Sequence, residues 1–170
     1  MRTSKFKWTQ LGMALVIVVM ALSPAFISDT AKALPAPAVG VVCTNGPTFS
    51  LTAGPGNIIL SDGNTMFMWS YSPSGGGFQY PGPVLCVNEG DTVTVILHND
   101  LPEPVSIIFP GQENVLADGV AAQPEFDGLG NLVSLTTTAP VGGDVTYSFV
   151  ADHPGTFIYQ SGTDPKKQVA

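Results

Sequence analysis

Short runs of strand-forming residues, each ended by a cluster of turn-forming residues, limit the folds open to this chain more than any other feature. The runs are rich in Val, Ile, Thr, Phe and Tyr, and Gly, Pro, Asn and Asp separate them. No long amphipathic helix pattern follows Ala33. This spacing predicts an all-β fold, a Greek-key sandwich or barrel. The expected strands are Val39–Thr44, Asn57–Leu60, Thr65–Tyr71, Val84–Val87, Thr92–Asn99, Val105–Phe109, Leu132–Thr137, Val145–Ala151 and Thr156–Gln160.

The connections between these strands carry turn signals of their own. Ser61–Asn64 (SDGN) predicts a hairpin turn, and Gly90 is expected to take a positive φ between two strands. The acidic stretch Asp118–Gly130 is expected to be a long connection that holds one short helical turn.

The first 33 residues have the order of a secretory signal peptide. Basic residues at the start precede the apolar run Leu11–Ser23 and the small-residue triplet Ala31–Ala33. The run is shorter than the roughly 20 residues that a membrane span needs. We therefore predict cleavage after Ala33, with Ala25 as the second choice and an uncleaved anchor as the alternative. Residues 34–170 then form one domain in a secreted or periplasmic protein.

The chain beyond Ala33 is strongly acidic. Lys166 and Lys167 are its only cations, against 12 of the 13 acidic residues, which gives a formal net charge of −10. A basic footprint for nucleic acid is absent from this sequence. So is a cationic patch for an anionic membrane surface.

Cys43 and Cys86 are the two cysteines, and both lie beyond the predicted signal peptide. In an oxidising compartment a disulfide between them is expected. The alternative is a copper-binding thiolate, but a blue-copper site needs two histidines and a cysteine, with a weak axial Met. The only histidines are His98, at a strand end that should face solvent, and His153, in a turn.

Other candidate site residues have simpler interpretations. Four aromatic residues are expected to pack in the core and loops rather than to form a carbohydrate platform. Four acidic residues match no EF-hand spacing and are expected in a solvated loop. Sequence motifs of hydrolases, zinc proteases and phosphate-binding loops are absent. The aromatic residues are Trp69, Tyr71, Phe78 and Tyr80, and the acidic ones are Glu113, Asp118, Glu125 and Asp127.

Three segments carry a family resemblance: Tyr80–Pro104 (YPGPVLCVNEGDTVTVILHNDLPEP), Ser106–Gln112 (SIIFPGQ) and His153–Gly162 (HPGTFIYQSG). Together they resemble the N-terminal plastocyanin-like (cupredoxin) domain of multicopper oxidases. In that family a G-P-x-x-x-V-x-x-G-D segment leads through a strand to N-x-L-x-x-P-x-S-I. The ligand motifs H-W-H-G and P-G-T-x-x-Y-H-S-H follow. The resemblance covers about half of the chain and implies a cupredoxin-like sandwich.

The resemblance also locates the family's copper ligands. Its four histidines would fall on Ile108, Pro110, Gln160 and Gly162, and none of these positions holds histidine. Isoleucine, proline and glycine offer no ligand atom in their side chains, and glutamine is a poor copper ligand beside imidazole. The resemblance therefore implies that this chain has no ligands for copper, the cofactor of the family.

In the family a final G-L-x-G-x-x-x-V strand completes the sandwich, whereas this sequence stops at KKQVA. The resemblance implies that the last strand is missing and that the partners are further cupredoxin domains of a larger parent protein. The leading hypothesis is thus a secreted, multicopper-oxidase-like N-terminal domain with a structural or interaction role. One alternative is a small copper-binding electron carrier that uses His98, His153 and a reduced cysteine. The other is a secreted β-sandwich that binds glycans or a partner protein.

Overall fold

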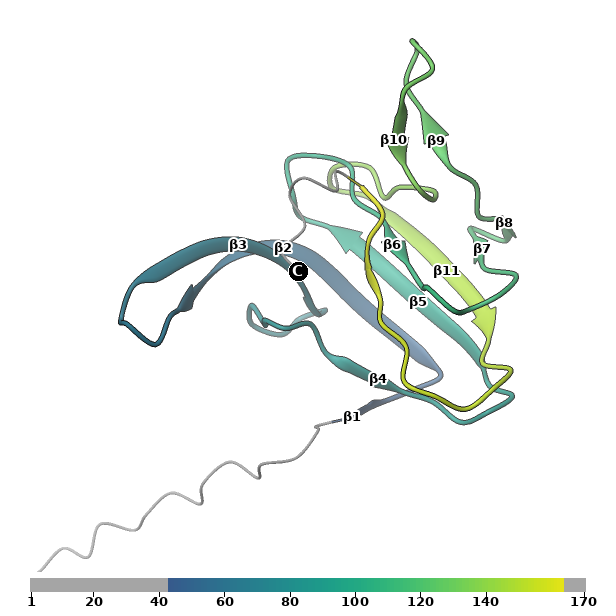
Figure 1. Cartoon of the computed structure of the whole chain (residues 1–170), viewed down its shortest axis with the longest axis horizontal. Helices are drawn as coiled ribbons and strands as arrows, with labels where there is room; N and C mark the ends of the chain where they lie inside the picture. Colours follow the sequence, from purple (N-terminus) through teal and green to yellow (C-terminus); the bar gives the residue numbers. More distant parts are fainter. Residues whose placement is uncertain (1–42, 164–170) are drawn as a thin grey trace, which may run out of the picture. The chain divides into compact units, whose positions relative to one another are not determined.

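Strands, turns and irregular connections make up residues 43–163, the part of the chain that the computed structural model describes (Figure 1). This range contains no helix, so the predicted all-β fold is confirmed. It therefore also lacks a helix that could cross a membrane. The predicted signal peptide, residues 1–33, lies outside the described residues. The strands are β1 (Cys43–Asn45), β2 (Thr48–Ile59), β3 (Thr65–Pro73), β4 (Val84–Cys86), β5 (Thr92–Asn99), β6 (Ile107–Ile108), β7 (Leu116–Ala117), β8 (Val120–Ala121), β9 (Glu125–Phe126), β10 (Leu132–Ser134), β11 (Asp144–Val150) and β12 (Gln160–Ser161).

A six-stranded sheet in the order β3-β2-β5-β11-β7-β8 carries the core. The strand β5 lies at its centre, parallel to β2 and antiparallel to β11. Side chains alternate between the two faces of a strand, so every second residue of these strands points to the interior. The buried residues that follow this alternation are Phe49, Leu51, Ala53, Val93, Val95, Leu97, Val145 and Tyr147.

A second layer covers the buried face of the sheet. It includes the two-stranded sheets β1-β4 and β6-β12 and the loop that leads to β6. Leu101, Val105, Ile107 and Phe109 from this region belong to the same hydrophobic core as the sheet residues, and Leu85 and Tyr159 pack against it. The two layers therefore form a β-sandwich around one core.

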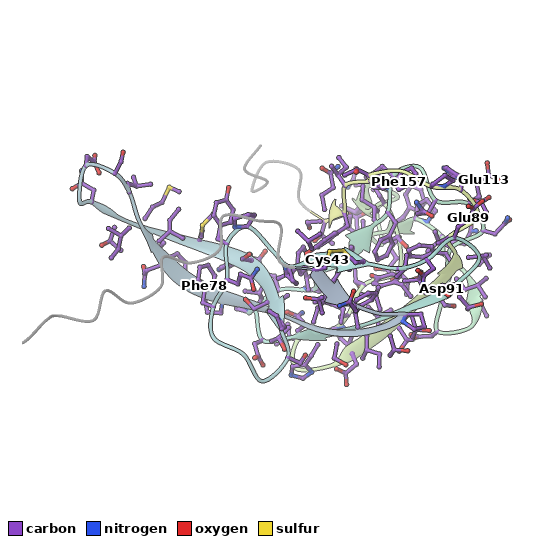
Figure 2. The ribbon with its side chains drawn as sticks, turned by 90° about the horizontal axis from the view of Figure 1, so that it is seen from below. Cys43, Phe78, Glu89, Asp91, Glu113 and Phe157 are labelled. Carbon is purple, nitrogen blue, oxygen red and sulfur yellow. A yellow bond between two sulfur atoms is a disulfide. The ribbon has the colours of Figure 1, made fainter. Side chains whose placement is uncertain are left out.

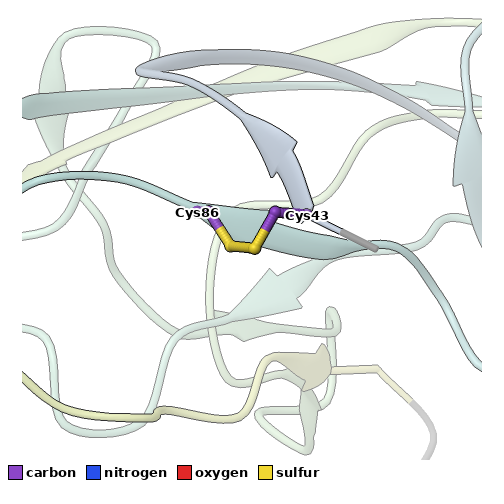
Figure 3. Close-up of a disulfide and its surroundings, with 2 residues drawn as sticks. All are labelled: Cys43 and Cys86. Atoms are coloured by element: carbon purple, nitrogen blue, oxygen red, sulfur yellow. A yellow bond between two sulfur atoms is a disulfide. The ribbon is translucent and has the colours of Figure 1, made fainter. Parts of the chain in front are cut away.

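The hairpin and the disulfide were predicted correctly. Ile59 pairs with Thr65 across the SDGN turn, and Gly90 takes a φ of 86°. Cys43 and Cys86 are bonded, with their Cα atoms 5.6 Å apart (Figure 3). Their strands β1 and β4 are parallel neighbours, so the bond joins two segments that also share backbone hydrogen bonds.

Other strand predictions were wrong. Residues 48–56 belong to β2, although the expected strand in this part of the chain began only at Asn57. Pro55 is tolerated because β2 pairs with β5 only as far as Ala53, so beyond that point one edge of β2 is free within the described residues. Gly56 is needed because the ring of Phe78 covers it, and an added Cβ would lie 2.1 Å from that ring.

Two further segments differ from expectation. The acidic connection Asp118–Gly130 contains β8 and β9 and no helical turn. The predicted strand Thr156–Gln160 is reduced to β12, which begins only at Gln160. Residues 156–159 alternate in sequence like a strand but lack the neighbouring strand that would stabilise that conformation.

Candidate functional site

The two segments that carry the predicted ligand positions lie side by side. Ile108 in β6 pairs directly with Gln160 in β12, and an added Cβ at Gly162 would lie 2.9 Å from Cγ2 of Ile108. Pro110 is exposed, two residues beyond the end of β6. The structure therefore brings Ile108, Gln160 and Gly162 together and leaves Pro110 at the surface.

A buried cluster of hydroxyl groups holds these segments in place. The Oγ atoms of Ser106 and Ser134 are 2.9 Å apart, and Ser134 also donates to the carbonyl of Thr136 at 2.6 Å. The backbone of Gly162 donates to the carbonyl of Ser106 and accepts from the N–H of Leu135. Neutral hydroxyl groups that already hydrogen-bond to each other offer no strong metal ligand. Within residues 43–163, no three His, Cys, Asp or Glu side chains are grouped so that they could hold a metal ion.

Gly162 is the tightest point of this cluster. We expect Gly162→Ala to lower the free energy of unfolding by about 1–3 kcal/mol, because overpacking a filled interior forces its neighbours to shift. The added Cβ would lie 2.7 Å from Oγ of Ser106. Denaturant unfolding measures the change. Gly54→Ala is the matched control, since a Cβ there meets nothing within 4 Å. Equal unfolding midpoints for the two variants would contradict the prediction.

Three tyrosines stabilise the same region through hydrogen bonds from their hydroxyl groups. Tyr71 donates to the carbonyl of Ser106 at 2.7 Å, and Tyr147 donates to the carbonyl of Thr137 at 2.6 Å. Tyr159 donates to the carbonyl of Pro83 at 2.8 Å, and burial raises the pKa of Tyr159 to about 12. Burial also raises the pKa values of Tyr71 and Tyr147. All three phenols are therefore neutral donors, and their role is to hold backbone rather than to react.

The aromatic residues that were weighed as a binding platform are dispersed. Trp69 and Tyr71 pack against the core, Phe78 covers Gly56, and Tyr80 is half-exposed. The expectation of core and loop packing is thus confirmed for the first three.

The two histidines lie at opposite ends of the β5–β11 pair. His98 is opposite Asp144 where β11 begins, whereas His153 follows the end of β11. Both cysteines are bonded to each other in the disulfide, so neither is present as a reduced thiol. The structure therefore contradicts the electron-carrier alternative, which needs His98, His153 and a reduced cysteine in one place.

His98 lies between two carboxylates. Its Nδ1 is 2.7 Å from Asp144 Oδ1, and its Nε2 is 3.2 Å from Asp100 Oδ1. The hydrogen bond to Asp144 raises the pKa of His98, and the charge of Asp100 contributes to the same effect. The imidazolium thus bridges the ends of two strands, and this contact was not foreseen from the sequence, which indicated a solvent-facing residue.

The raised pKa predicts a pH dependence of stability. Because the folded-state pKa of His98 exceeds the ordinary value of 6.5, its contribution is fully present below about pH 6.5. It is lost as the pH rises through the folded-state pKa. We expect unfolding free energies between pH 6 and 9 to fall less steeply in Asp144→Asn than in the parent protein. His98→Gln should make the pH dependence of the unfolding free energy less steep in the same way. An unchanged slope in both variants would contradict this assignment.

The acidic residues are more ordered than a solvated loop. Glu125 accepts hydrogen bonds from the backbone and the hydroxyl group of Thr138, and Asp118 accepts one from the N–H of Thr146 at 2.8 Å. Asp127 accepts from the side-chain amide and the backbone N–H of Asn131 and from the N–H of Leu129, which lowers its pKa. Three of the four carboxylates thus shape turns and strand contacts, and Glu113 is exposed.

Comparison with known proteins places this chain in a family. A family model described as multicopper oxidase matches residues 74–170, more than half of the chain. The chain therefore belongs to the multicopper oxidase family, as the sequence motifs predicted. Laccase-1 from Emericella nidulans is 35% identical over 102 residues, which cover 55% of this chain and 15% of the laccase.

Solved structures agree with the cupredoxin-like fold. A multi-copper oxidase from Pseudomonas thermotolerans aligns with a TM-score of 0.50 and 26% identity, over 72% of this chain and 26% of that one. A multi-copper oxidase from Pediococcus acidilactici aligns with the same TM-score at 19% identity, over 72% and 23%, and supports the fold alone. The chain thus spans about a quarter or less of the length of these relatives.

Proposed function

We propose that the chain is the N-terminal cupredoxin-like domain of a larger exported protein, and that this domain has a structural or interaction role without copper of its own. The observation that carries the proposal is the packing at the predicted ligand positions. Ile108 offers no ligand atom, and Gly162 is enclosed so closely that even a methyl group would contact Ser106 and Ile108. A ligating side chain at Gly162 would require the side chains of Ser106 and Ile108 to move.

Export and a larger parent protein rest on separate observations. The first 33 residues have the pattern of a secretory signal peptide, and the disulfide fits an oxidising compartment. This chain covers only a small share of the length of its relatives, and this supports a larger parent protein. The mass of the mature protein, recovered from the medium or the periplasm of its host, tests both points. A cytoplasmic product without a disulfide would contradict export.

Copper retention tests the central part of the proposal. The protein, incubated with Cu²⁺ and desalted, should retain no stoichiometric copper and show no intense blue absorption, because a Cys–His₂ set is not assembled among the described residues. Elemental analysis and the visible spectrum provide the measurement.

The control variants are His98→Ala and His153→Ala, which should behave like the parent protein in this assay. Retention of one copper per chain, lost in either variant, would show a site built on that histidine. Retention that survives both substitutions would show ligands outside these residues. Either result contradicts the proposal.

A further inference from the structure

The hairpin formed by β9 and β10 lies outside the core of the sandwich. Figure 1 shows these two strands extending away from β5 and β11. Every residue from Phe126 to Val133 is exposed, and none of them belongs to the hydrophobic core. Five large hydrophobic side chains on the hairpin or just after it are nevertheless open to solvent. They are Phe126, Leu129, Leu132, Val133 and Leu135.

Hydrogen bonds hold this hairpin in one conformation. At its turn, both carboxylate oxygens of Asp127 accept hydrogen bonds at 2.8 Å. The donors are the backbone N–H groups of Leu129 and Asn131 and the side-chain amide of Asn131. At its base, the carboxylate of Glu125 accepts hydrogen bonds from the backbone N–H and the hydroxyl group of Thr138. Polar contacts thus order both ends of the hairpin, while the apolar side chains between them stay exposed.

The exposed apolar side chains of the hairpin are adjacent to one another. Phe126 and Leu132 are opposite each other in the ladder, so their side chains lie on the same face of the hairpin. Their exposed fractions are 61% and 52%, and that of Leu129 in the turn is 89%. Neighbouring exposed apolar groups on an ordered element are typical of an interaction site. An aromatic residue beside aliphatic ones can fill a pocket on a partner.

The charge in the turn argues against a lipid surface as the partner. The hydrogen bonds from Asn131 lower the pKa of Asp127, so its carboxylate is ionised at neutral pH. Insertion of Leu129 into hydrocarbon would carry this charge toward the membrane interior, which is costly. Residues 43–163 also contain no lysine or arginine that could bind anionic headgroups.

The distribution of charge also argues against a second copy of this chain. Figure 2 shows three further carboxylates, those of Glu89, Asp91 and Glu113, toward one end of the domain. Contact between two copies would bring like charges together. Obligate interfaces are more apolar than reversible ones. In the hairpin, a carboxylate lies between Phe126 and Leu129 in the sequence, which favours reversible contact with a protein that supplies positive charge.

We propose that residues 125–135, the docking hairpin, bind a separate protein that presents an apolar pocket with lysine or arginine at its rim. Phe126 and Leu129 enter the pocket, and the basic side chain pairs with Asp127. The inference rests on the interaction role proposed above and names the class of partner.

Photocrosslinking of the full-length gene product in its host tests the proposal. One form carries the photoreactive residue benzoylphenylalanine at position 129, and the control form carries it at position 59. Ile59 is 80% exposed at the end of β2, so the two positions are similarly accessible. We expect position 129 to crosslink to one other protein, with about tenfold or higher yield than position 59. Mass spectrometry should map the contact to apolar residues beside lysine or arginine.

Matched variants then test the contact with the purified partner. Leu129→Asp should weaken binding by about tenfold or more, whereas Ile59→Asp should not. Asp127→Asn keeps an oxygen acceptor for the turn but removes the charge, so it should weaken binding and reduce its dependence on salt. Calorimetry measures the affinities, and thermal unfolding verifies that the variants fold.

Several results would overturn the inference. Equal crosslinking yields from positions 129 and 59 would show that the hairpin is not a preferred contact. Crosslinks to lipid, to a second copy of the chain or to another domain of the same polypeptide would each identify a different occupant. Binding that neither salt nor Asp127→Asn changes would remove the role of charge. Each result leaves the copper assay untouched, so failure of this inference is distinguishable from failure of the proposed function.

Discussion

Replacing both Cys43 and Cys86 by alanine should lower the free energy of unfolding by about 4 kcal/mol, the chain-entropy value for a closed loop of this length. The bond joins residues 43 positions apart in the sequence. It also anchors β1, whose three residues are all exposed and which pairs only with β4 within the described residues. Without the bond, little apolar burial holds β1 in place. Urea or guanidinium unfolding under oxidising conditions measures the difference.

Two controls separate the cross-link from side-chain effects. Reduction of the parent protein should bring its unfolding midpoint down to that of the double variant, and reducing agent should not change the double variant. Thr44→Ala, in the middle of the same exposed strand, should change stability by a few tenths of a kcal/mol only. A double variant as stable as the oxidised parent would show that the bond contributes nothing.

The strands that sequence analysis located best are those at the centre of the sheet. In Thr92–Asn99 alternate residues are buried, and both edges of this strand are paired, with β2 and β11. Local pattern and tertiary environment therefore agree. The turns were also predictable, because Gly63 and Gly90 take positive φ values that glycine tolerates best.

Sequence analysis failed where pairing depends on distant residues. Thr156–Tyr159 alternates like a strand, yet pairing needs a neighbouring edge, and no described strand pairs with these residues. Conversely, no strand was expected between Thr48 and Gly56, but β3 provides partners for Gly54 and Pro55. Strand propensity reflects fit to a pleated, partly buried surface, so a single sequence window cannot settle either case.

The candidate site also has features that the sequence predicted and features that it did not. The positions Ile108, Pro110, Gln160 and Gly162 were found from motifs, because motif order along the chain identifies aligned residues. The enclosure of Gly162 by Ser106 and Ile108 was not foreseen, since it depends on how β6 and β12 pair. The hydrogen bonds of Glu125 and Asp118 likewise join residues 13 and 28 positions apart.

Asn99→Ala should be nearly as destabilising as loss of the disulfide, at about 2–4 kcal/mol. Asn99 is fully buried at the end of β5, and its side chain makes three hydrogen bonds to backbone groups. It donates to the carbonyls of Glu103 and Ala139 at 2.8 and 3.0 Å, and it accepts from the N–H of Leu101 at 2.9 Å. The N–H of Leu101 loses its partner, and a buried group left without one costs about 1–3 kcal/mol. The carbonyl of Ala139 loses one of its two donors and keeps the N–H of Val105.

The position of Asn99 explains why the loss should extend beyond a single contact. The loop from Asp100 to Pro104 leads from the central sheet into β6, and Asn99 holds both this loop and the chain at Ala139. Ala139 in turn forms a bridge with Val105, just before β6. Asn99→Ala should therefore loosen β6 and its partner β12, and amide exchange at Ile107 and Gly162 should accelerate along with the drop in the unfolding midpoint.

Asn57→Ala, at an exposed position of β2, is the matched control and should change stability by less than about 0.5 kcal/mol. If the two variants unfold at the same midpoint, the buried amide does not hold the loop. If only global stability falls while exchange at Gly162 keeps pace with the rest of the sheet, then β6 and β12 unfold with the core and do not form a separately held layer.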